Sequence, residues 1–232
     1  DVSSIGAVAI APSNPDVVWV GTGETFIIRP AHAVGDGVYK SDDVGKSWQH
    51  MGLPKTGRIG RVVIHPTNPD IVYVAALGHT FGPQQDRGIF KTTDGGKTWD
   101  KILFIDENTG AADIEIDPKN PDRLLVGMWS IHINTWGLNS GGTGGGVYRS
   151  VDGGATWKAM KDNGLPGGEQ RPVGKTGVAI SPSQPDVAYA LFEIESPALY
   201  RTDNFGESWT LITRNHDINE RAPYYTRMRV SA

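Results

Sequence analysis

A twelve-residue phrase recurs four times along this chain, and its spacing limits the folds that the chain can adopt. The copies are GVYKSDDVGKSW (37–48), GIFKTTDGGKTW (88–99), GVYRSVDGGATW (146–157) and ALYRTDNFGESW (198–209). The closing tryptophans are separated by 51, 58 and 52 residues. A repeat of about 50 residues predicts similar units that pack side by side.

A second phrase alternates with the first and completes each unit. It consists of an alternating segment, a Pro-x-(Asn/Gln)-Pro-Asp turn and a second, largely apolar segment, and its copies are residues 5–24, 59–79, 111–129 and 176–193. Proline fixes φ, and Asn and Asp bond neighbouring backbone groups, so the chain reverses between two strands at each turn. Four strands in about 50 residues are the size of a propeller blade.

The composition agrees with an all-β fold. The 30 glycines and 15 prolines are scattered, and no long window shows a helical apolar period. We therefore predict an all-β β-propeller of about four four-stranded blades, covering residues 5–52, 59–104, 111–162 and 176–214. Residues 224–232 are expected to be the first strand of a further blade. The chain is accordingly interpreted as a segment of a larger propeller of six to ten blades, with a closed four-blade disc as the alternative.

Other totals exclude several classes of function. The net charge is −4, from 22 Lys and Arg against 26 Asp and Glu, which gives no basic footprint for nucleic acid. No apolar run approaches the ~18 residues of a membrane-spanning helix. Cysteine is absent, so disulfides and thiolate zinc sites are excluded. We expect no cofactor.

The first phrase ends in a motif that we call the box, Ser/Thr-x-Asp-x-Gly-x-Ser/Thr-Trp, in which the fourth copy has Asn in place of Asp. Its key residues are Asp43, Gly45, Trp48, Asp94, Gly96, Trp99, Asp152, Gly154, Trp157, Asn204, Gly206 and Trp209. The motif resembles the Asp-box, or BNR repeat, of β-propellers. With the Asn-Pro-Asp turns and the GTGE segment, the chain most resembles large bacterial proteins with sortilin-type (VPS10-like), glycosyl-hydrolase-like propellers. That resemblance implies a secreted, periplasmic or cell-surface location and the binding of peptides or protein partners.

The box is predicted to be structural rather than catalytic. A calcium loop needs six to eight oxygen ligands, and one box offers too few. An amide at Asn204 replaces a hydrogen-bonding carboxylate but not an acid or a metal ligand. If the turns and boxes share one end of each sheet, the functional site is expected at the other end, in the loops between the second and third strands of each blade, which we call the B–C loops.

The B–C loops carry side chains suited to binding a sugar or a peptide, namely aromatic rings beside charged and amide groups. The predicted binding residues, including Arg58 at a strand start, are Glu24, Arg29, His32, Arg58, His79, Arg87, Trp129, His132, Trp136 and Glu193. The alternative is that the tryptophans cover the ends of the blades and the charges are a solvated rim. His32, His79 and His132 lack the spacing of a metal site, and none is predicted. The glycine-rich run GLNSGGTGGG (137–146) does not match a phosphate-binding loop and is interpreted as a flexible loop.

We expect non-catalytic recognition of a carbohydrate or a polypeptide at the B–C loops. Two alternatives remain open. The first is glycoside hydrolysis of a xyloglucanase-like or sialidase-like type, which requires a facing carboxylate pair; the candidates are Glu24, Asp36, Asp86 and Glu193. The second is a structural segment whose partners are the remaining blades of a longer chain or another protein.

Overall fold

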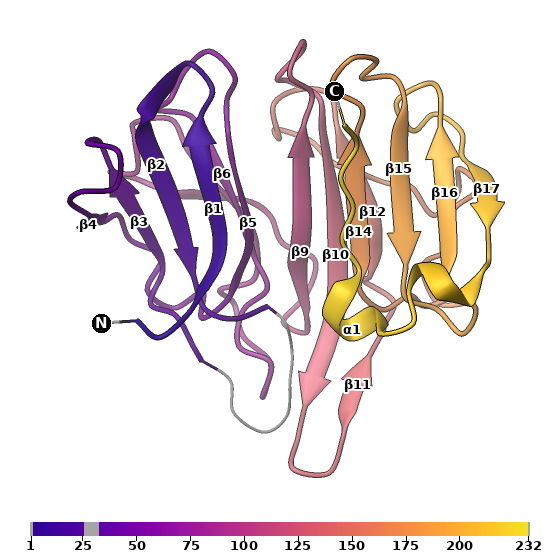
Figure 1. Cartoon of the computed structure of the whole chain (residues 1–232). Helices are drawn as coiled ribbons and strands as arrows, with labels where there is room; N and C mark the ends of the chain where they lie inside the picture. Colours follow the sequence, from indigo (N-terminus) through magenta and orange to yellow (C-terminus); the bar gives the residue numbers. More distant parts are fainter. Residues whose placement is uncertain (1, 26–32, 232) are drawn as a thin grey trace. The chain divides into compact units, whose positions relative to one another are not determined.

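The regular secondary structure of the chain consists almost entirely of β-strands (Figure 1). The computed structural model describes residues 2–25 and 33–231. That part of the chain contains seventeen strands, one 3-10 helix (His216–Ile218) and one short α-helix, α1 (Ala222–Tyr225). The prediction of an all-β fold is therefore confirmed.

The strands form four sheets in which spatial order largely follows sequence order. The first sheet contains β1 (Ile5–Ala11), β2 (Asn14–Thr22), β3 (Val38–Ser41) and β4 (Gln49–His50). The second contains β5 (Ile59–Ile64), β6 (Val72–Ala76), β7 (Gly88–Thr92) and β8 (Asp100–Leu103). The fourth contains β14 (Thr176–Ile180), β15 (Ala188–Phe192), β16 (Ala198–Thr202) and β17 (Thr210–Thr213). Neighbouring strands in these three sheets pair antiparallel, as expected for blades.

The third sheet has an additional strand that the sequence did not reveal. It contains β9 (Thr109–Ile116), β10 (Leu124–Ile133), β11 (Leu138–Ser140), β12 (Gly146–Ser150) and β13 (Lys158–Ala159). Strand β11 pairs with the end of β10, with Ile131 opposite Ser140. The run interpreted as a flexible loop therefore begins as the second strand of a hairpin, because β10 continues beyond its pairing with β12 and offers a free edge.

The chain divides into two compact units, residues 1–111 and 112–232, and each unit is described by itself. In the first unit, Ile59, Val62 and Ile64 of β5 pack on the first sheet. The first sheet is lined by small residues at this contact: a Cβ atom at Gly21 would lie 2.3 Å from Cγ2 of Ile59. Glycine at that position therefore permits the close approach of the two sheets.

The second unit has a separate core between its own two sheets. Leu125 and Val147 of the third sheet contact Val178 and Ile180 of β14. The sequence suggested residues 224–232 as the first strand of a further blade. Tyr224 and Tyr225 instead belong to α1, and residues 226–231 form no strand. The boundaries of the four blades remain predictions.

Each box is a closed hydrogen-bonded loop between the third and fourth strands of its sheet. In the first box, Asp43 accepts hydrogen bonds from the hydroxyl of Ser41 (2.7 Å), the backbone N–H of Ser47 (2.9 Å) and the hydroxyl of Ser47 (2.6 Å). The Ser41 oxygen in turn accepts from the N–H of Gly45 at 2.8 Å. Gly45 has φ of 83°, the left-handed conformation that favours glycine. The bonds from Ser47, followed by that from Ser41, lower the pKa of Asp43 to about 2.

The fourth box keeps this geometry with asparagine. Asn204 Oδ1 accepts from the Thr202 hydroxyl at 2.8 Å and from the Ser208 N–H at 3.0 Å. The amide nitrogen of Asn204 donates to the Ser208 hydroxyl at 3.0 Å. In the first box the direction is reversed, because the Ser47 hydroxyl donates to the Asp43 carboxylate. The amide therefore preserves the loop, which supports a structural role for the box.

A backbone hydrogen bond joins every box to the Pro-Asp turn of its own sheet. The acceptors are the carbonyls of Asp16, Asp70, Asp122 and Asp186, and the donors are the N–H groups of Val44, Gly95, Gly153 and Phe205, at 3.0, 3.0, 2.9 and 2.8 Å respectively. The two repeated phrases thus meet at the same end of each sheet. The B–C loops lie at the opposite end, because each intervening strand spans the sheet.

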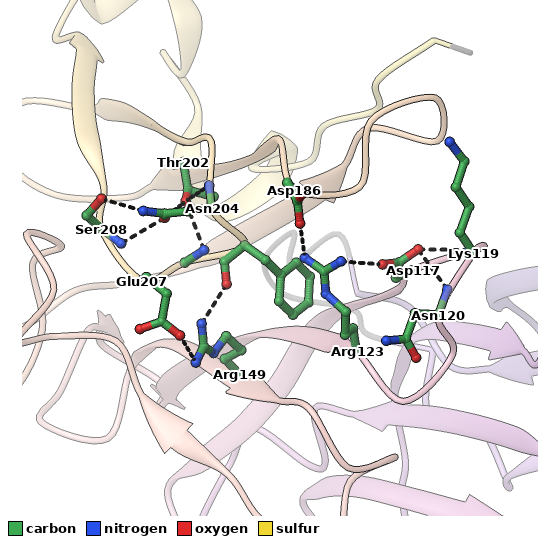
Figure 2. Close-up of polar contacts among 12 residues, drawn as sticks. Asp117, Lys119, Asn120, Arg123, Arg149, Asp186, Thr202, Asn204, Glu207 and Ser208 are labelled. Atoms are coloured by element: carbon green, nitrogen blue, oxygen red, sulfur yellow. Dashed lines mark hydrogen bonds and ion pairs between the residues drawn. The ribbon is translucent and has the colours of Figure 1, made fainter.

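In the second unit, two arginines from the third sheet and its turn hold the box of the fourth sheet (Figure 2). Arg149 donates to the carbonyl of Phe205 at 2.9 Å and pairs with Glu207 at 2.5 Å. Arg123 lies over the Phe205 ring, with its guanidinium carbon 3.8 Å from the ring centroid, and pairs with Asp186 at 2.6 Å. The box of one blade is therefore also a contact to the preceding blade of the same unit.

We expect Asp152→Asn to retain the thermal midpoint of the parent at neutral pH and Asp152→Ala to lower it, because only the amide can repeat the pattern at Asn204. The pKa of Asp152 is lowered from 3.8 to about 2, mainly by hydrogen bonds from Thr156. Its contribution to stability is thus fully present above pH 3.8 and is lost as the pH falls through about 2. Acid titrations followed by circular dichroism should therefore show a shallower loss for Asp152→Asn. Equal midpoints of the Ala and Asn variants at neutral pH would contradict a structural acceptor.

The outer face of the first sheet is apolar and exposed. Val8 and Ile10 of β1 are 62% and 59% exposed, whereas Val62 and Ile64, one repeat later in β5, are 3% and 4% exposed. The two pairs occupy equivalent positions, and β5 buries its pair against the first sheet. The second sheet uses this face of β5 to pack on the first sheet. The equivalent face of β1, in the first sheet, is exposed.

The difference in burial gives a matched pair of substitutions. Val8→Lys should change the free energy of unfolding by no more than about 0.5 kcal/mol, whereas Val62→Lys should lower it by about 3 kcal/mol or more, because it buries an unpaired charge. Urea denaturation of both variants measures the difference. Similar losses would mean that the face of β1 is covered within this chain.

Candidate functional site

The B–C loops follow β2, β6, β10 and β15, and they bring the predicted residues into two separate groups, one in each unit. Arg29 and His32 lie outside the described residues. In the first unit the described candidates are Glu24, Asp36, Arg58, His79, Asp86 and Arg87. In the second unit they are Trp129, His132, Trp136 and Glu193.

Asp36 is engaged in holding the base of its loop. Its carboxylate accepts a hydrogen bond from the Tyr39 hydroxyl at 2.7 Å, and its N–H donates to the Thr22 hydroxyl at 3.0 Å. The bond to Asp36, with burial and the charge of Asp36, raises the pKa of Tyr39. Asp36 thus anchors the loop. The backbone N–H of Glu24 donates to the Ala33 carbonyl at 2.9 Å and joins the two ends of the same loop.

Arg87 is buried and fastens the loop after β6. Its guanidinium donates to the carbonyls of Asn108 at 2.7 Å, Gly82 at 3.2 Å and His79. Burial lowers its pKa to about 10. Burial, followed by the charges of Arg58 and Arg87, also lowers the pKa of His79, although the charge of Asp86 opposes the shift. His79 is therefore favoured in its neutral form.

Arg58 lies in the same unit, immediately before β5, and its side chain is fully buried. Its guanidinium carbon is 5.8 Å from the ring centroid of Phe81. Burial lowers the pKa of Arg58, and the charge of Glu24 partly compensates. Three nitrogen-bearing cationic or titratable side chains, Arg58, His79 and Arg87, therefore share a desolvated environment in the first unit.

The second unit contains a groove between the β10–β11 hairpin and the loop after β15. Its volume is about 570 Å³. Glu193 and Glu195 line one side of the groove, and the end of the hairpin lines another. The lining residues are Ser140, Gly141, Gly142, Thr143, Pro172, Gly174, Glu193, Ile194 and Glu195. Carboxylate, hydroxyl and backbone groups thus face a space large enough for a small ligand.

A chain of hydrogen bonds fixes Glu193 at the wall of this groove. The indole N–H of Trp129 donates to the Ser140 oxygen at 2.8 Å, and the Ser140 hydroxyl donates to Glu193 Oε2 at 2.6 Å. The N–H of Lys175 donates to the same carboxylate oxygen at 2.6 Å. Trp129 is fully buried. The prediction that it offers an exposed ring to a ligand is therefore not met, because its indole supports Glu193 from within.

Trp136 has the exposed ring that Trp129 lacks. It lies in the turn between β10 and β11, in the hairpin that projects from its sheet in Figure 1, and is 88% exposed. The side chain of Asn134 accepts from the N–H groups of Trp136 (3.0 Å) and Gly137 (2.7 Å) and so fixes the turn. His132 lies on the same hairpin, opposite Asn139.

Ser140 is a site residue that the sequence did not indicate. It lies in the glycine-rich run, and only the pairing of β11 with β10 brings it between Trp129 and Glu193. The four predicted catalytic carboxylates are divided, with Glu24, Asp36 and Asp86 in the first unit and Glu193 in the second. Among the described residues there is no group of three or more His, Asp or Glu side chains arranged to hold a metal ion.

Comparisons with known proteins agree with the fold. The Sortilin-Vps10 profile (sortilin, neurotensin receptor 3) matches residues 36–136. A xyloglucanase of Paenibacillus sp. is 29% identical over 178 residues, which are 68% of this chain and 16% of that protein. A xyloglucanase of Hypocrea jecorina (strain QM6a) is 27% identical over 188 residues, which are 70% of this chain and 20% of that protein.

A solved structure extends the likeness to nearly the whole chain. The crystal structure of an ancestral GH74 enzyme matches with a TM-score of 0.67 and 22% identity, over 94% of this chain and 25% of that structure. The chain thus spans a fifth or less of the two curated relatives. The four sheets and these matches define a partial β-propeller of the sortilin-like and glycosyl-hydrolase-like type. In the described residues, no helix has the length and apolar character needed to cross a membrane.

Lys175 ties the C-terminal segment to the wall of the groove, and this contact should depend on pH. Its side chain is 2% exposed, and Nζ donates to the carbonyls of Pro223 at 3.2 Å and Tyr224 at 3.1 Å. Burial, followed by the charge of Arg227, lowers the pKa of Lys175 from 10.5 to about 7.

Between pH 7 and 10.5 the unfolded chain therefore binds a proton at Lys175 that the folded chain lacks. We expect the stability conferred by this site to rise with pH across that range. The difference in unfolding free energy between the parent and Lys175→Met, measured by urea denaturation at several pH values, isolates this contribution. A difference that is constant with pH would contradict the shift.

Proposed function

We propose that this propeller segment recognises a saccharide, without hydrolysing it, through the groove of the second unit. The observation that carries the proposal is the fixed Glu193 carboxylate at the wall of a groove of about 570 Å³. Recognition of sugar hydroxyls depends on hydrogen-bonding groups that are already oriented before the ligand arrives.

The groove offers acceptors and donors in a defined arrangement. The hydrogen bonds that Glu193 accepts from Ser140 and Lys175 both engage Oε2. Oε1 is therefore proposed as the acceptor for a ligand hydroxyl. Glu195, the Thr143 hydroxyl and the glycine backbone add further polar groups to the lining. Such a mixture suits a neutral polyhydroxylated ligand.

Trp136 supplies the apolar surface that a sugar ring needs. A flat indole stacks on the C–H face of a sugar while the edges of the sugar bond to polar groups. The hairpin that carries Trp136 ends at Ser140, which lines the groove. The exposed ring and one wall of the groove therefore belong to the same hairpin.

The relatives favour a saccharide over a polypeptide as the ligand. The two curated proteins described above are named as xyloglucanases, and the matched solved structure is a GH74 enzyme. Because the chain covers only a small part of each, the activity of the whole relatives is not carried over. Xyloglucan is the first ligand to test.

Binding without hydrolysis is supported by the surroundings of Glu193. The Ser140 hydroxyl and the Lys175 N–H both donate hydrogen bonds to Glu193, which holds its carboxylate in one orientation as an acceptor. Glycoside hydrolysis needs two cooperating carboxylates, with Glu195 as the other carboxylate in this groove. Hydrolysis remains the alternative function.

The exposed face of the first sheet favours a second role, as a segment that packs on other blades. A shallow apolar depression of about 580 Å³ is lined by Val2, Ile5, Val20, Thr22, Tyr39 and Trp48. Trp48 is 42% exposed, whereas its counterpart Trp99 donates to the carbonyl of Met51 on the first sheet at 2.7 Å. A further blade of the same type, in a longer chain or a partner, fits this face. Export from the cell, as the resemblance implies, is part of the same proposal.

We expect xyloglucan oligosaccharides to bind the chain with no release of reducing ends. Trp136→Ala should raise the dissociation constant about fivefold, because the stacking contact is lost. Trp48→Ala, which removes an exposed indole in the first unit, serves as the matched control and should leave binding unchanged. Isothermal titration calorimetry and a reducing-sugar assay measure the two quantities.

Two outcomes would replace this proposal. Release of reducing ends that is abolished by Glu193→Gln would establish hydrolysis at the same groove. No binding of xyloglucan or of other neutral glucans would remove the groove as a saccharide site. A parallel assay with Glu24→Gln tests whether a carboxylate of the first unit contributes to any turnover.

A further inference from the structure

Arg58 in the first unit is a buried cation whose hydrogen bonds are unmade. Its side chain is fully buried, and within residues 2–25 and 33–231 none of its three guanidinium nitrogens has a hydrogen-bond partner. A guanidinium carries five N–H donors, and removing them from water without acceptors is strongly unfavourable. The Phe81 ring and the charge of Glu24 compensate only in part.

Arg87 is a second buried arginine of the same unit, and it serves as a comparison because its hydrogen bonds give it a structural role. It is also fully buried, but its two terminal nitrogens donate to backbone carbonyls of His79, Gly82 and Asn108. Among the described residues, the terminal nitrogens of Arg87 therefore have acceptors and those of Arg58 have none. This contrast is the reason to look for a ligand at Arg58.

Thr80 adds an independent sign of a missing ligand. Its side chain is fully buried, and its hydroxyl has no hydrogen-bond partner among the described residues. It precedes Phe81, the residue whose ring lies beside Arg58. Phe81 itself is 54% exposed, so the residue beside the buried guanidinium is accessible to solvent.

We propose that Arg58 is an anion-binding site that receives the carboxylate of an acidic saccharide such as a uronate. The planar guanidinium fork matches a carboxylate with two parallel hydrogen bonds. The Phe81 ring moves aside to admit the carboxylate and then stacks on the sugar ring. Charge complementarity is provided by the Arg58 guanidinium, with the cation of Arg87 in the same desolvated environment.

This site is separate from the groove of the second unit and takes a different ligand. The groove presents carboxylates and suits neutral sugars, whereas Arg58 presents an unpaired cation. The inference uses the proposed function only in taking a saccharide as the ligand. If neutral glucans fail to bind the groove, the proposal for Arg58 still stands. If uronates fail to bind at Arg58, the proposal for the groove still stands.

The test compares Arg58→Met with Arg87→Met, since methionine keeps the apolar stem and removes the charge. Without ligand, Arg58→Met should raise the thermal midpoint by about 2–4 °C or more, because it removes an unpaired buried charge. Arg87→Met should lower the midpoint, because three backbone carbonyls lose their donor. If Arg58 has a structural role, both substitutions should lower the thermal midpoint.

Ligand binding is measured by calorimetry with glucuronate and oligogalacturonate, with glucose and acetate as the neutral and carboxylate-only arms. The parent should bind the uronates more tightly than either control, and Arg58→Met should weaken uronate binding at least tenfold. A lower midpoint for Arg58→Met, equal binding of uronate by the variant and the parent, or binding of acidic peptides without uronates would overturn the proposal.

Discussion

The hydrogen bond between the carbonyl of each Pro-Asp turn and the N–H of its box is the constraint on which the rest of the structure depends. It joins the first hairpin of a sheet to the last at one end, at 2.8–3.0 Å in all four sheets. The same end is internally saturated by the box side chains, as at Asp43 and Asn204. The B–C loops at the other end are consequently free to differ in length and chemistry.

The two units use this freedom in opposite ways. In the first unit, the loops bury cations, and one of them, Arg58, lacks acceptors. In the second unit, β10 extends into a hairpin and builds a groove with Glu193 and Glu195. A single repeated framework thus carries buried arginines in one unit and a groove lined by two carboxylates in the other, and the net charge of −4 describes neither region.

The fold was largely readable from the sequence, whereas the site was readable only in part. The turns and boxes are governed by bonds within about five residues, so their residue types identify them, down to the exchange of Asn204 for aspartate. Trp129 and Glu193 were identified as candidates, but Ser140, which joins them, was not. Ser140 accepts a hydrogen bond from Trp129 and donates one to Glu193, from which it is separated by 53 residues. Spacing along the chain carries no signal for such a contact.

The same distinction explains why an unsatisfied group is more informative than a satisfied one. Trp129, Ser140 and Glu193 form a closed hydrogen-bonded chain, so their arrangement is explained by the folding of the second unit alone. Arg58 and Thr80 have no hydrogen-bond partners in the described part of the chain, so the hydrogen bonds of the folded unit do not explain their arrangement. Buried polar groups are normally hydrogen-bonded, so an unpartnered guanidinium calls for a specific explanation, and the proposed ligand supplies one at Arg58.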